Sequence, residues 1–295
     1  MRGVSTGAPG RLAPFVVLAI ALVAVSHGAI FARLADAAPF AIAAWRLGIA
    51  CLLVVPFAIV APGDGAFAPR AVALAIGAGA LLALHFGTWI ASLEYTTIAR
   101  SVLLVSTAPI WVALMQFAAN RLLPSRAAML ALAFATAGAL VVGSGSLGGD
   151  AALAGDLLAV AGAIAMAGYL LLSRAAQASL PFRGYLGIAY GSAAAWLWLA
   201  VGVTGTQATG FDATTWWALA GMALVSQIVG HSGYNWSLRH LDPLYVAVAL
   251  VGEPVLAAFL GWWLLGEAVE WRTGAGGILI LAGIAIGARA AHARN

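Results

Sequence analysis

Five ionisable side chains of this sequence lie inside long apolar stretches and are the first candidates for chemistry. They are Arg46, Glu253 and the three histidines His27, His85 and His231. At the centre of a membrane span a charged residue costs about 2.5–3.5 kcal/mol, so such residues usually face a bundle interior or a wet cavity. Glu253 could bind a proton or a cationic ligand group, and the guanidinium of Arg46 could hold a carboxylate. The histidines could hydrogen-bond a ligand or relay protons.

Each of these side chains also has a structural interpretation, which the sequence leaves open. Glu253 could cap a helix that breaks at Pro254, whose ring removes a backbone hydrogen bond. Arg46 could extend to the outer headgroups or pair with an acid in an outer loop. Each histidine could simply hold two helices together through a hydrogen bond.

A second set of candidates combines polar groups with apolar bodies. His231 and Asn235 are four residues apart, as are His85 and Trp89, so each pair would share one helix face. An apolar pocket with a few polar groups is typical of small-molecule sites. Ordinary packing between helices is the alternative for each residue. The side chains that we add to the candidate site on this basis are Trp89, Ser101, Tyr169, Tyr234, Asn235 and Tyr245.

The composition excludes a soluble protein. Of the 295 residues, 63% are hydrophobic and 8% are charged, against roughly 25% charged residues in a soluble domain. Most of the surface must therefore face lipid. All 14 basic residues are arginines that are scattered singly, which argues against a nucleic-acid partner. The single cysteine, Cys51, makes neither an intramolecular disulfide nor a metal site, and no catalytic or cofactor motif occurs.

Ten apolar runs are long enough to cross a bilayer, whose core of about 30 Å needs roughly 20 helical residues. Continuous runs without alternation favour helices over a barrel. Ten arginines fall on one predicted side and three on the other, which places both termini in the cytoplasm. The predicted spans are 13–32, 39–61, 71–93, 97–118, 126–144, 155–173, 184–203, 215–237, 243–265 and 273–290.

An internal repeat relates the two halves of the sequence, 1–146 and 147–295. Five spans in each half force the halves into opposite orientations, the inverted-repeat plan of many transporters, with the substrate site near the midplane. The sequence therefore predicts an all-α membrane protein with ten transmembrane helices as two inverted five-helix repeats. The matches that share one offset of 145 residues are Ser92 with Ser237, Leu93 with Leu238, Pro109 with Pro254 and Gly138 with Gly283.

Short motifs also occur in a fixed order along the chain. In the second half they are Asn235-Trp236-Ser237-Leu238, Gly252-Glu253-Pro254-Val255, Leu265-Gly266-Glu267, Gly274 and Gly283. In the first half they are Pro39, Arg46, His85, Trp89, Ser92-Leu93, Tyr95-Thr96 and Pro109. With these motifs the chain resembles the EamA-type branch of the drug/metabolite transporter superfamily over nearly its whole length.

The resemblance implies a ten-helix inner-membrane carrier that works by alternating access, with one EamA-like repeat in each half. It implies a central cavity lined by the first, third, fourth, sixth, eighth and ninth spans. Relatives mostly export amino acids, related metabolites or toxic compounds, and some import metabolites.

The functional hypothesis is a secondary transporter that exports amino acids or similar small metabolites. No ATP-binding motif occurs, so the driving force would be a gradient, of protons for example, or the substrate itself. The main alternative is an importer of a nucleobase, vitamin or other metabolite, and a membrane-embedded enzyme on a lipid-linked substrate is an alternative of another class. The expected partners are the substrate, protons and the lipid bilayer of a bacterial inner membrane. The sequence leaves open whether the protein is a homo-oligomer.

Overall fold

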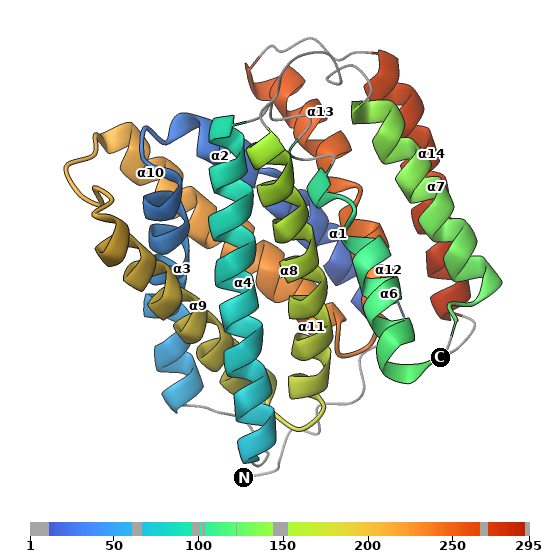
Figure 1. Ribbon diagram of the computed structural model, residues 1–295, viewed down its shortest axis with the longest axis horizontal. Helices are drawn as coiled ribbons and strands as arrows, with labels where there is room; N and C mark the ends of the chain where they lie inside the picture. Colours follow the sequence, from blue (N-terminus) through green and yellow to red (C-terminus); the bar gives the residue numbers. More distant parts are fainter. Residues whose placement is uncertain are drawn as a thin grey trace.

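Every regular element in the described part of the chain is a helix (Figure 1). The computed structural model describes residues 12–60, 67–95, 101, 104–121, 123–143, 153–265 and 271–292. A helix suits a lipid environment because it satisfies its backbone hydrogen bonds internally. The first half contains α1 (Ala13–Ser26), α2 (Gly28–Leu34), α3 (Pro39–Val60), α4 (Pro69–Tyr95), α6 (Ala108–Asn120) and α7 (Arg126–Gly143). The second half contains α8 (Leu153–Gln177), α9 (Phe182–Thr204), α10 (Ala213–Gly221), η2 (Met222–His231), α11 (Ser232–Ser237), α12 (Pro243–Leu250), α13 (Glu253–Leu265) and α14 (Trp271–His292).

The described helices make this a multi-pass membrane protein. Six stretches are long and apolar enough to cross a bilayer: Ala13–Ala32, Pro39–Val60, Pro69–Tyr95, Leu153–Gln177, Phe182–Thr204 and Pro243–Leu264. Two shorter apolar helices lie within α7 and α14. The span predicted at 97–118 overlaps α6, which has 13 residues, and the span predicted at 215–237 is divided among α10, η2 and α11.

The count of ten spans stays a prediction. The predicted division between residues 146 and 147 also stays a prediction, because it lies outside the described residues, as do Thr96 and the Gly266-Glu267 pair.

Two helices are interrupted at equivalent positions of the two halves. The chain turns at residues 106–107 before α6 and at residues 251–252 before α13, and these pairs differ by the repeat offset of 145 residues. Pro109 and Pro254 follow within the first two positions of the next helix. Proline is favoured there because the first N–H groups of a helix have no intrahelical partner. Both breaks therefore expose helix ends in the middle of the bundle.

A third irregularity is the ten-residue π-helix η2, which joins α10 to α11. π-Helical segments are rare and often mark functional sites. Here η2 contacts both α1 and α3. The Ser226 hydroxyl donates to the carbonyl of Ala24 on α1 at 3.2 Å, and the next residue, Gln227, faces α3. The segment ends at His231, so it sets the direction in which that imidazole projects.

Helices α7 and α14 lie side by side (Figure 1) and approach most closely at two glycines. A Cβ atom on Gly138 would lie 2.5 Å from the carbonyl oxygen of Gly276, and one on Gly283 would lie 2.7 Å from that of Ala131. The contacts are equivalent, because Ala131 and Gly138 precede Gly276 and Gly283 by 145 residues. Ala131, the earlier residue in α7, meets Gly283, the later residue in α14, and Gly138 meets Gly276. The two helices are therefore antiparallel. Small residues permit such close approach in lipid.

Candidate functional site

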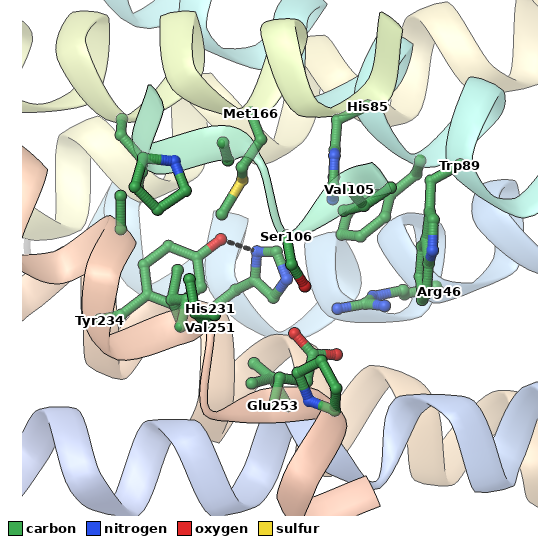
Figure 2. A pocket seen from close by; sticks show the side chains of 18 residues that line it. Arg46, His85, Trp89, Val105, Ser106, Met166, His231, Tyr234, Val251 and Glu253 are labelled. Atoms are coloured by element: carbon green, nitrogen blue, oxygen red, sulfur yellow. Dashed lines mark hydrogen bonds between the residues drawn. The ribbon is translucent and has the colours of Figure 1, made fainter. Parts of the chain in front are cut away.

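A cavity lies in the middle of the bundle, between the two helix breaks (Figure 2). Side chains from α1, α3, α4, α6, α8, η2, α11, α12 and α13 line it. These elements cover the six spans that the family resemblance implied, and α3 adds the second span through Arg46. Six of the predicted site residues line this cavity: Arg46, His85, Trp89, His231, Tyr234 and Glu253.

Arg46 projects from α3 into the bundle and is only 2% exposed. Its Nε donates to Oε1 of Gln227 on η2 at 2.8 Å. Its guanidinium carbon lies 4.0 Å from the centre of the Phe86 ring on α4, which is an attractive cation–π arrangement. These two contacts hold the positive charge at the cavity wall rather than at the membrane surface.

His85 and Trp89 form a stacked pair on one face of α4, with ring centres 6.1 Å apart and planes 8° from parallel. Nδ1 of His85 lies 3.0 Å from the carbonyl oxygen of Gly162 on α8. A carbonyl only accepts, so Nδ1 is the donor, and Nε2 of the neutral ring is left as an acceptor. The indole Nε1 of Trp89 is buried and has no hydrogen-bond partner in the structure. The pair therefore offers one acceptor and one unused donor.

His231 begins a buried hydrogen-bond network that leads away from the cavity. Its Nδ1 shares a hydrogen bond with the Tyr234 hydroxyl (Figure 2). Asn235 donates from Nδ2 to the Tyr169 hydroxyl and to the His231 carbonyl, and its Oδ1 accepts from the Tyr185 hydroxyl at 3.2 Å. All five residues belong to the second half. The network satisfies polar groups that would be costly to bury alone, and it fixes the orientation of His231.

Glu253 is the first residue of α13, directly after the second helix break. Its carboxylate points into the cavity, and so does the guanidinium of Arg46; no hydrogen bond joins the two groups (Figure 2). A carboxylate at a helix N-terminus is favoured by the helix dipole. Glu253 therefore lies at a helix N-terminus, as the capping interpretation has it, and also lines the cavity. The first break contributes Ser106 to the same cavity.

Five predicted site residues do not line the cavity: His27, Ser101, Tyr169, Asn235 and Tyr245. His27 lies between α1 and α2, and its Nδ1 bonds the carbonyl of Val23 at 2.9 Å. Ser101 is hydrogen-bonded to Ser92 at 2.6 Å. Tyr245 packs edge-on against Phe15, with ring centres 5.7 Å apart. Tyr169 and Asn235 belong to the network with His231, and the Tyr169 ring also packs edge-on against Tyr234, which lines the cavity.

Sequence reasoning missed Gln227, Phe86 and Met166. Phe86 and Met166 are ordinary apolar residues of a helix face, so their types gave no signal. Gln227 did give one, because it is an amide in the middle of an apolar run, but a search for ionisable groups passes over it. Among the residues that the structure describes, no three His, Cys, Asp or Glu side chains come together as a metal site.

A helical bundle with interrupted helices around a central cavity defines a multi-pass membrane protein of the transporter type. The sequence model of the EamA-like transporter family matches residues 13–144 and, a second time, residues 153–288. The chain therefore belongs to the EamA-like transporter family, and it is a membrane transporter of the drug/metabolite transporter superfamily.

A crystal structure described only as that of a protein has the same fold. It is 18% identical in sequence, with a TM-score of 0.78 over 97% of this chain and 100% of the other. No curated protein matches this chain.

Proposed function

We propose that this protein is a secondary transporter of the inner membrane that exports amino acids or similar small zwitterionic metabolites by alternating access. The observation that carries the proposal is the pair of opposite charges on one cavity. Arg46 and Glu253 both line it, and no hydrogen bond joins them. A zwitterion could satisfy both, with its carboxylate at Arg46 and its ammonium group at Glu253.

The position of the cavity supports the proposal. Substrate sites of inverted-repeat transporters lie near the midplane, beside discontinuous helices. Here the breaks before α6 and α13 both reach the cavity. A catalytic role on a lipid-linked substrate would need an acid and a base directed at a reacting bond, whereas Glu253 is the sole carboxylate among the described residues that line this cavity.

The size of the cavity indicates that the helices must move during transport. The cavity has a volume of about 70 Å³, and one water takes about 30 Å³ in the liquid. The cavity therefore holds only a few waters. A larger solute requires the walls to separate, and rocking of one half against the other would do so.

Glu253, His85 and His231 are the groups we propose as sensitive to protons, since each can gain or lose one at the cavity wall. Export would be driven by proton entry, with efflux fastest when the outer compartment is acidic. The direction itself rests on the family resemblance.

The test is transport by purified protein in liposomes loaded with radiolabelled L-alanine, with adenine in parallel liposomes. Saturable alanine efflux that rises with an acidic exterior and falls in Glu253→Gln and Arg46→Lys is the expected result. Glu94→Gln, which changes an exposed carboxylate at the end of α4, is the control and should match the wild type. Flux of adenine without alanine would replace the proposal by the importer alternative, and no flux of either would refute it.

A further inference from the structure

We propose that Arg46 and Trp89 form an oxyanion subsite at the cavity wall that takes a carboxylate group, with Gln227, which lies behind the cavity lining, as the positioning residue of Arg46. The inference rests on the proposed function in one respect: it assigns the anionic end of that same cavity. It is carried by the hydrogen bonds of three buried side chains, each of which has N–H donors without acceptors.

The contacts of Arg46 fix the direction of its guanidinium. Arginine has five N–H donors in a planar fork. One of them, on Nε, is used by Oε1 of Gln227 at 2.8 Å, and the ring of Phe86 covers a face of the group. The two terminal nitrogens are then left with their donors for another acceptor. No carboxylate accepts from them among the side chains drawn around the cavity (Figure 2).

The hydrogen bond to Arg46 fixes the orientation of the Gln227 amide. Because arginine only donates, the oxygen of the amide must face Nε, and the amide nitrogen must point elsewhere. That nitrogen is buried without a partner, in a residue that is 0% exposed. The amide is therefore held in one orientation, and its oxygen fixes the direction of the guanidinium from behind the cavity lining.

Trp89 supplies a further N–H donor to the subsite. Its Nε1 is likewise buried without a partner, and the residue lines the cavity. Arg46 lies over Phe86, and Phe86 precedes Trp89 by three residues, so both rings belong to one face of α4. A buried donor without an acceptor is costly. An oxyanion that accepts from the guanidinium fork and the indole would satisfy both sets of donors.

The identity of the amide matters for the charge of the subsite. A glutamate at position 227 would still accept from Nε, but it would neutralise Arg46 and repel an anion. A glutamine positions the arginine and leaves its charge available. Gln227 is therefore a determinant of specificity. Because it leaves the charge of Arg46 available, the subsite distinguishes a carboxylate ligand from its neutral amide.

The test measures thermal unfolding of the full-length protein in detergent with sodium propionate, propionamide, inorganic phosphate or sodium chloride at equal ionic strength. Ligands that bind the folded state raise the melting temperature. Propionate should stabilise the wild type more than propionamide, phosphate or chloride. We expect Gln227→Met to weaken propionate binding about tenfold, the loss of one well-placed hydrogen bond to a charged group, and Gln227→Glu to abolish it.

Gln177→Met is the matched control. Gln177 on α8 is also buried, its amide has no partner, and unlike Gln227 it makes no hydrogen bond to Arg46. Its substitution should leave propionate binding unchanged. Equal stabilisation by propionate and propionamide, stronger stabilisation by phosphate, or full propionate binding in Gln227→Glu would overturn the subsite. If alanine flux is absent while propionate still binds in this pattern, the proposed function fails and the subsite stands.

Discussion

Neutralising both Arg46 and Glu253 should cost the fold less than the sum of the two single substitutions. Each single change leaves one charge in the cavity wall without its counterion. Opposite unit charges 4 Å apart attract by about 4 kcal/mol at an effective dielectric constant of 20. These two groups line one cavity and form no hydrogen bond (Figure 2), so their attraction is weaker than this value. We therefore expect a favourable coupling of about 1–3 kcal/mol, within the range found for residues that share one site.

The assay is a double-mutant cycle of unfolding free energies with Arg46→Met, Glu253→Gln and the double variant. It is run at about pH 8.5, well above the ordinary carboxyl pKa. The double variant should regain stability relative to the more damaged single variant, yet it should not transport. Additivity within about 0.3–0.5 kcal/mol is normal for independent sites, and that result would refute the electrostatic account of the cavity.

Three further predictions concern the helices around the site. Gly138→Ala should destabilise the protein by about 1–3 kcal/mol, as overpacking does, because the new methyl would meet a backbone oxygen at 2.5 Å; Gly274→Ala on α14, with nothing within 4 Å, should be neutral or stabilising. Tyr185→Phe should lower the unfolding free energy by about 1–3 kcal/mol, because Ser173 and Asn235 lose its hydroxyl; an unchanged value would contradict the network. Hydrogen bonds at the start of α10 hold the pKa of the Asp212 carboxyl below its usual range; stability from such a group is present at neutral pH and lost as pH falls through the lowered pKa, so Asp212→Ala should lower the melting temperature at neutral pH and the gap should close in acid.

The sequence predicted the framework well because lipid leaves few choices. Long apolar runs in a bilayer must be helices, so the positions of α3, α4, α8 and α9 followed from composition alone. Glu253 and Arg46 were found because a charge inside such a run demands an explanation. The repeat offset then predicted that both halves contribute to one cavity.

Other residues of the site could not be predicted, because their positions depend on how the helices pack against one another. His27 and His85 look alike in the sequence, but the imidazole of His27 bonds a carbonyl of its own helix region, whereas His85 lines the cavity. Which face of a helix turns inward depends on its neighbours when all faces are apolar. The π-helix η2 could not be foreseen either, because a shift of the helical period leaves no trace in a run that is apolar on most of its faces. Gln227 lies in that segment, and it was missed.

The contact between α7 and α14 resembles the interface of a symmetric dimer, but here the two halves are joined in one polypeptide. A patch that meets its own equivalent is what a two-fold axis produces between identical subunits. In this protein the partners are tethered, so their association no longer depends on protein concentration. Tethering also releases the halves from being identical. Ala108 occupies the position 145 residues before Glu253, so one break carries a carboxylate and the other a methyl group. A pair of identical subunits would bring two acids to the same cavity, whereas the described residues that line the cavity here include one acid, Glu253, and one arginine, Arg46.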